Sequence, residues 1–107
     1  MKYDELFEKH PIRFRTPEEA EATLTRLTKL WGRFRRSRNS AGLARVAHEA
    51  EKGRRRAAMI AKNRRVRLEK RREKEEIALW FEIWLLEPEA FSLWLQMRRE
   101  KLDSASE

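Results

Sequence analysis

The longest stretch of the chain without a strong helix-breaking residue runs from residue 41 to residue 86, and it limits the possible folds more than any other feature. It contains no proline, and Gly53 is the only glycine between Gly42 and Pro88. A lone glycine costs a helix about 1 kcal/mol relative to alanine, which weakens the helix without ending it. The pattern therefore predicts one continuous helix over 41–86, roughly 70 Å long at about 1.5 Å per residue.

The middle of this predicted helix, residues 52–74, is strongly basic. It carries twelve Lys or Arg against Glu69 and Glu73, whereas the whole chain has a net charge of only +8. Residues 1–25 and 75–107 each have a net negative charge. A charged helix that acts only as a spacer could have Lys and Glu in similar numbers and needs no net charge. The excess of cations in this segment, and its separation from the acidic segments, therefore favour a binding surface for an extended polyanion.

A second helix is predicted over residues 17–36. Thr16 can cap its first turn, Pro17 suits the first helical position, and Glu19 can reach back to the cap. The apolar residues of this segment recur every three or four positions, so they form a stripe that needs a partner. They are Ala20, Leu24, Leu27, Leu30, Trp31 and Phe34.

Residues 37–42 form the one convincing turn in the middle of the chain. Asn39 tolerates a left-handed backbone, and Ser40 can cap the helix that follows. With only six Gly and Pro in 107 residues, the composition favours helix elsewhere. We therefore expect one all-α domain over 1–107, built as a helical hairpin of 17–36 against the long basic helix 41–86.

Short helices are expected at both ends of this hairpin. The first covers residues 2–9 and ends before Pro11, and the last begins at Pro88 and runs to about residue 102. After Pro11, Ile12 and Phe14 alternate with Arg13 and Arg15, which predicts an extended linker held against the core by its apolar side chains.

Residues 77–102 form a predicted aromatic assembly region, because the segment 77–86 is apolar on two separate faces. The last helix can cover one face. Helix 17–36 reaches back only about 30 Å along the long helix, to near residue 61, so the other face should stay bare. This predicts a homo-oligomer. Its expected interface residues are Ile77, Leu79, Trp80, Phe81, Ile83, Trp84, Leu86, Phe91 and Trp94.

The sequence gives little support for catalysis, a cofactor or a metal site. Cysteine is absent, and His10 and His48 are the only histidines, with no clustered carboxylates around them. No nucleophile motif or Gly-rich phosphate loop is present. The first residues lack the apolar core of a signal peptide, and no apolar run is long enough to span a membrane, so we expect a cytoplasmic protein without integral membrane association.

We therefore expect a non-enzymatic protein that binds DNA or RNA through phosphates, without sequence specificity, in an accessory, packaging or architectural role. The four tryptophans fall on apolar stripes, and residues 52–74 contain no aromatic side chain, which argues against stacking of single-stranded bases. The alternative is an adaptor that docks the basic segment on an acidic protein, and peripheral binding to anionic membranes is a third possibility. The candidate nucleic-acid-binding residues are Arg33, Arg35, Arg36, Arg38, Arg54, Arg55, Arg56, Lys62, Arg64, Arg65, Arg67, Arg71, Arg72 and Lys74.

Overall fold

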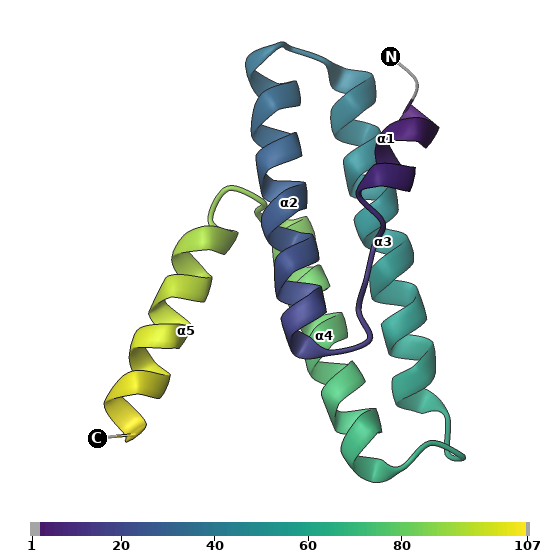
Figure 1. Ribbon diagram of the computed structural model, residues 1–107, viewed down its shortest axis with the longest axis vertical. Helices are drawn as coiled ribbons and strands as arrows, with labels where there is room; N and C mark the ends of the chain where they lie inside the picture. The colour runs from purple at the N-terminus through teal and green to yellow at the C-terminus, as the bar shows by residue number, and fades with distance from the viewer. Residues whose placement is uncertain (1–2, 107) are drawn as a thin grey trace.

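The computed structural model describes residues 3–106, with side chains described up to residue 103. Within this range the chain forms five helices and no strand, which confirms the all-α class (Figure 1). The helices are α1 (Tyr3–Lys9), α2 (Pro17–Arg36), α3 (Ser40–Lys62), α4 (Leu68–Leu86) and α5 (Phe91–Ser106).

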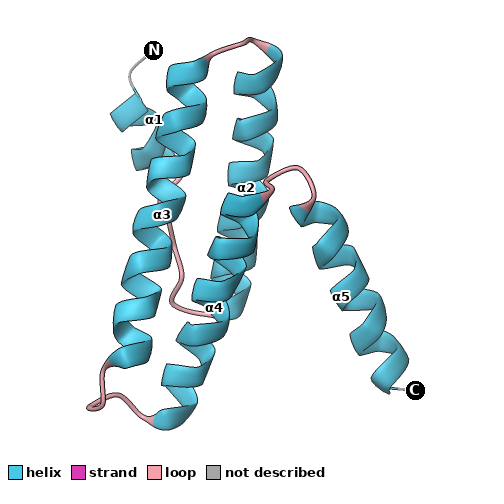
Figure 2. Ribbon diagram, turned by 180° about the vertical axis from the view of Figure 1, so that it is seen from behind, coloured by secondary structure: helices cyan, strands magenta, loops and turns pink. Residues whose placement is uncertain are grey.

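Helices α2, α3 and α4 run up, down and up to form an antiparallel three-helix bundle (Figure 1). The most extensive packing joins α3 to α4, and α2 packs against both. Helix α1 lies beside the first half of α3, and the extended linker 11–16 returns from it to the start of α2. Helix α5 diverges from the bundle after the turn that follows α4, as the view from behind also shows (Figure 2).

Helix α2 has the bounds that the sequence predicts. The Oγ1 atom of Thr16 accepts a hydrogen bond of 3.1 Å from the backbone N–H of Glu19, and Pro17 occupies the first helical position. This satisfies one of the N–H groups that a helix start leaves without an internal partner. The predicted stripe faces the bundle: Ala20, Leu24, Leu27, Leu30 and Phe34 are buried, and Trp31 is half-buried.

The turn between α2 and α3 lies where we expected it, but its residues have different roles. Arg38, and not Asn39, adopts the left-handed backbone, with φ of 56°. Asn39, and not Ser40, caps α3, because its Oδ1 atom accepts a hydrogen bond of 2.9 Å from the N–H of Gly42. The short side chain of Asn39 reaches the first turn of the helix from the position before it, as capping requires.

The prediction of one helix over 41–86 is wrong. Helix α3 ends at Lys62, residues 63–67 form a turn, and α4 returns antiparallel to α3 (Figure 2). Asn63 supplies the local reason: its backbone is extended, and its Oδ1 atom accepts a hydrogen bond of 3.0 Å from the N–H of Arg65. Such local bonds offer the backbone an alternative to the helix. The longest dimension of the molecule is 41 Å, so the predicted 70 Å rod does not form.

Gly53, which we identified as the weak point of the long helix, lies in the uninterrupted middle of α3. At this position glycine allows the side chains of other segments to approach the helix closely. A Cβ atom at this position would lie 2.8 Å from Cγ2 of Ile12 and 2.9 Å from Cε1 of Phe81. Glycine therefore lets the linker and α4 pack directly against the backbone of α3.

The fold-back also covers the face that we expected to stay bare. Ile77, Trp80, Phe81 and Trp84 are buried within the chain. The indole N–H of Trp84 donates a hydrogen bond of 2.9 Å to Thr28 of α2, and its ring meets Trp31 edge to face at 5.8 Å. Because α4 runs back along α3, it lies beside α2, and the geometric reason for predicting an oligomer is lost.

Helix α5 begins at Phe91, three residues later than predicted, because residues 88–90 form a turn after α4. Phe91 and Leu95 are buried against the bundle, and the half-buried Trp94 packs on Trp80 at 6.3 Å. The guanidinium of Arg98 lies 4.5 Å from the centre of the Trp80 ring. Ion pairs from Arg98 to Glu76 and from Arg99 to Glu21 add two further contacts.

The remaining residues of the predicted oligomer interface differ in their exposure to solvent. Leu79 and Leu86 are exposed, and Ile83 is half-buried.

None of the helices in the described part of the chain combines the length and the apolar content that a membrane crossing requires.

Candidate nucleic-acid interface

The predicted phosphate-binding residues do not lie on one surface. Arg33, Arg35, Arg36 and Arg38 lie at the end of the bundle where α2 turns into α3, and we call these four residues the upper cluster. Residues 62–72 lie at the other end, around the turn from α3 to α4 (Figure 1). Helix α3 separates the two groups by its length of 23 residues, about 35 Å.

Two of the three arginines in the middle of α3 form hydrogen bonds with a carboxylate. Glu51 accepts hydrogen bonds from Arg54 at 2.6 and 2.8 Å and from Arg55 at 3.1 Å. The hydrogen bonds from Arg54 are the main cause of the low pKa of Glu51, which falls to about 2. Arg56 is exposed and lies near the linker, where it lines a small hollow together with Lys52 and Glu49.

The fold brings the linker to a pocket beside the turn between α3 and α4. Arg13 and Arg15 line the same pocket as Ile60, Val66 and Lys70. We define the basic end as the seven exposed cations in this region: Arg13, Arg15, Lys62, Arg64, Arg65, Arg67 and Lys70.

Our sequence-based site omitted Arg13, Arg15 and Lys70. The alternation in residues 12–15 predicted that apolar side chains hold the linker against the core, but only the fold-back shows which helices the two arginines lie beside.

The side chains of the basic end are available to a ligand. All seven are exposed, and none forms an ion pair with another residue that the structure describes. Many cations elsewhere are paired, for example Arg45 with Asp4 and Glu49, and Arg35 with Glu89. An unpaired, exposed arginine can donate to a phosphate without first losing a carboxylate partner.

The first turn of α4 adds to the positive potential of the basic end. Arg67 precedes this helix, and no side chain caps its first turn. The backbone N–H groups at the start of a helix lack internal partners and carry a partial positive charge, which favours anions. Glu69 and Glu73 are the acidic residues in the first two turns of α4, and they reduce this potential.

Lys74 has a structural role, although we predicted it to bind phosphate. Its ammonium is buried and donates hydrogen bonds of 2.6 Å to the carbonyl oxygens of Phe14 and Arg15. It also lies 5.7 Å from the centre of the Phe14 ring. Burial lowers the pKa of Lys74. Lys74 therefore holds the linker in place, so we leave it out of the basic end.

Arg71 and Arg72 lie beside the basic end. The Nε atom of Arg71 is buried and has no hydrogen-bond partner among the described residues. Arg72 is exposed and lines a groove between α3 and α4 in which Glu75, Glu76 and Glu82 also lie. The mixed charge of this groove makes it a weaker phosphate site than the basic end.

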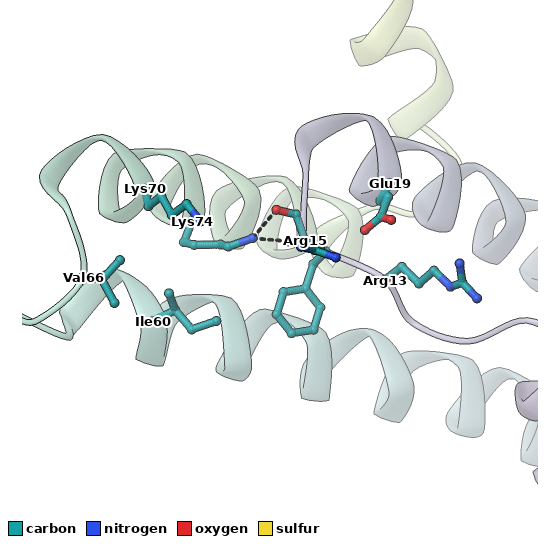
Figure 3. A pocket seen from close by; sticks show the side chains of 8 residues that line it. Arg13, Arg15, Glu19, Ile60, Val66, Lys70 and Lys74 are labelled. Carbon is teal, nitrogen blue, oxygen red and sulfur yellow. Dashed lines mark hydrogen bonds between the residues drawn. The ribbon is translucent and has the colours of Figure 1, made fainter.

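An open pocket of about 490 Å³ lies against the basic end, between the linker and the two helices. Figure 3 shows Lys70 and Lys74 of α4 on one side, with Ile60 and Val66 from the end of α3 and the turn below them. Phe14 completes the apolar lining, and Glu19 is the one acidic residue that lines the pocket.

The linker that forms one wall of the pocket is well anchored. The N–H of Arg13 donates to Oγ1 of Thr23 at 3.1 Å, and that hydroxyl donates to the carbonyl of Arg13 at 3.0 Å. Arg26 donates to the carbonyl of Pro11 at 3.2 Å. With the two hydrogen bonds from Lys74, these contacts fix the backbone of residues 11–15, so the pocket is formed before any ligand binds.

Among the described residues, no three His, Asp or Glu side chains lie together as the ligands of a metal ion would. Comparisons of the chain with protein-family models, curated protein sequences and solved structures found no match. The functional argument therefore rests on the basic end and its pocket.

Proposed function

We propose that this protein is a non-enzymatic nucleic-acid-binding protein that contacts phosphates through the basic end. The observation that carries the proposal is the convergence of seven exposed, unpaired cations from two segments that are far apart in the sequence. Phosphate contacts of this kind supply affinity and position without reading sequence. An accessory, packaging or architectural role follows from such binding.

The experiment compares two triple variants with equal changes in charge. In one, Arg64, Arg65 and Arg67 of the basic end are replaced by Glu. In the matched control, Arg33, Arg36 and Arg38 of the upper cluster are replaced by Glu. We expect the first variant to lose most of its affinity for a short DNA or RNA duplex at 0.1 M salt, and the control to keep more of it. Equal losses would contradict a role specific to the basic end.

The alternative function is an adaptor that docks the same cations on an acidic protein surface. Arginines that lie unpaired and exposed suit either partner, so the two functions are separated by what the protein carries from cells. Material with absorbance near 260 nm that high salt removes supports nucleic acid as the ligand. Material free of nucleic acid that retains one acidic protein supports the adaptor.

Self-association is a separate proposal, and it is supported by exposed apolar residues, of which Leu86 belongs to the predicted interface and Leu93 and Met97 do not. Leu86 is 80% exposed, and Leu93 and Met97 of α5 are each 60% exposed. Exposed apolar side chains of this size are candidates for a partner contact when they are contiguous. Light scattering at micromolar concentration tests the proposal, because a mass near 13.0 kDa would correspond to a monomer.

A further inference from the structure

The pocket beside the basic end combines two chemical properties. Its interior is apolar, lined by Phe14, Ile60 and Val66, whereas Arg15 and Lys70 supply cations beside it. The side chain of Arg13, which also lines the pocket, extends away from it (Figure 3). Its volume of about 490 Å³ lies within the range of roughly 300–1,000 Å³ that is common for small-molecule sites. A ligand that fits this arrangement has a small apolar or aromatic body joined to an anionic group.

We propose that the pocket receives the base of an unpaired nucleotide in a single-stranded nucleic acid, while Arg15 and Lys70 contact its phosphates. This inference rests on the proposed function, and it adds the class of nucleic acid. A nucleotide has the required chemistry, because its planar base stacks on aromatic side chains and its phosphate pairs with Arg and Lys. A paired base is stacked inside its duplex and enters a pocket only at the cost of unstacking and unpairing.

The fold removes the main argument against base stacking. Residues 52–74 contain no aromatic side chain, so the sequence favoured contacts to phosphates alone. The structure places Phe14, from the linker, beside Val66 and Lys70 of the basic region. Stacking and phosphate contacts can therefore occur at one place, although their residues are about 50 positions apart in the sequence.

Glu19 gives the pocket a polar acceptor beside its apolar lining. A carboxylate accepts hydrogen bonds and donates none when it is ionised. It suits the exocyclic amino groups of adenine, cytosine and guanine, whereas thymine and uracil have no such group. We therefore expect single strands of adenine or cytosine to bind more tightly than single strands of thymine or uracil.

The test uses ligands that differ in their bases but not in their phosphates. Affinity is measured for a single-stranded DNA oligonucleotide of 12 adenines, for an abasic oligonucleotide of the same length, for a duplex, and for a free adenine mononucleotide. The 12-adenine strand should bind roughly five- to tenfold more tightly than the abasic strand, which is the lower part of the range that stacking on an aromatic side chain provides. Equal affinity for the two strands would overturn the proposal.

Two variants assign any difference to the pocket. Phe14→Leu keeps an apolar side chain but removes the aromatic ring, and Val66→Gln replaces a short apolar side chain of the turn with a longer, uncharged polar one. Both should remove the preference for the base-containing strand while duplex affinity stays within about twofold of the wild type. Circular dichroism checks that each variant is folded, and Val66→Gln carries the test if Phe14→Leu unfolds the protein. A preference that survives in a folded variant would overturn the proposal.

The mononucleotide distinguishes a strand from a free nucleotide. Competition only at concentrations far above that of the oligonucleotide supports the strand. If the mononucleotide competes at the same concentration as the oligonucleotide, and Phe14→Leu removes this competition, the ligand is a free nucleotide. That result would overturn the proposal that the pocket binds a strand. Duplex binding that depends on Arg64, Arg65 and Arg67 would still support the proposed function if the pocket variants had no effect, so the two proposals can fail separately.

Discussion

The ammonium group of Lys74 donates a hydrogen bond of 2.6 Å to the carbonyl oxygen of Phe14, a residue 60 positions earlier in the chain. This bond joins α4 to the linker, and a second one reaches the carbonyl of Arg15. It therefore fixes the position of Arg13 and Arg15 relative to the turn that carries the other cations. The arrangement of the basic end depends on a lysine that is itself buried.

Replacing Lys74 with Met should destabilise the protein by roughly 1–3 kcal/mol, because the carbonyl groups of Phe14 and Arg15 lose their donor. Chemical denaturation measures this loss. Arg72→Met, an exposed basic residue in the same helix, is the control and should change the free energy of unfolding by less than about 0.5 kcal/mol. Equal effects of the two substitutions would show that the hydrogen bonds of Lys74 contribute little.

The same lysine gives a predicted dependence on pH. Burial lowers the pKa of Lys74 in the folded protein below its value of 10.5 in a model compound. Between the two pKa values the unfolded chain binds more protons, so stability rises with pH in that window. The stability of the wild type relative to Lys74→Met should therefore increase as the pH rises toward 10.5. A difference that stays constant or shrinks would contradict the lowered pKa.

Replacing Gly53 with Ala should destabilise the protein by roughly 1–3 kcal/mol, although alanine is the better helix former. The new Cβ atom would lie under 3.0 Å from Ile12 and Phe81, so one of these side chains must move. Gly32→Ala is a matched control in α2, because its Cβ atom would meet only the flexible side chain of Arg36, at 3.4 Å. The control should be neutral or stabilising, and thermal unfolding compares the two.

Replacing Trp84 with Ala should cost about 3–5 kcal/mol, the range expected when a large aromatic side chain is removed from a core. Trp84 is fully buried and makes a hydrogen bond to Thr28. Leu86→Ala, two residues later and 80% exposed, should change stability by less than about 0.5 kcal/mol. A folded Trp84→Ala monomer of unchanged stability would show that this residue faces a partner instead of the core.

The low pKa of Glu51 predicts that the protein loses stability in acid. Its hydrogen bonds from Arg54, and a further one from Arg55, lower the pKa of Glu51 from 4.5 to about 2. A lowered pKa stabilises the folded state above pH 4.5, and this contribution disappears as the pH falls toward 2. The difference in stability between the wild type and Glu51→Gln should shrink over that range in denaturation experiments. A difference that persists at pH 2 would contradict this.

Much of the fold could be predicted where local signals agree. Thr16 and Pro17 mark the start of α2, and the apolar stripe of that helix identifies its buried face. The turn at residues 63–67 could not be predicted in this way, because Asn63 alone is a weak signal and the segment lacks Gly and Pro. Tertiary contacts favour the turn, because folding back buries the side chains of Trp80, Phe81 and Trp84. The free energy gained by this burial is not visible in the local sequence pattern.

The candidate site was partly predictable for the same reason. The cations of residues 62–67 were evident from the charge run, but a helical rod was the wrong context for them. Arg13 and Arg15 could not be assigned to the site, because the fold-back determines which end of the bundle the linker passes. Lys74 was included in the predicted site because a lysine in a basic run is usually solvated, whereas here two backbone carbonyls hold it in the interior.

The dependence of nucleic-acid affinity on salt tests the central claim most directly. If all seven cations of the basic end contact phosphates, the logarithm of affinity should fall against the logarithm of salt concentration with a slope of about −6 for duplex DNA and about −5 for a single strand. Replacing Arg64, Arg65 and Arg67 with Gln should reduce the size of the duplex slope by about 3. A slope near zero in the wild type, or one that these substitutions leave unchanged, would contradict phosphate binding by the basic end.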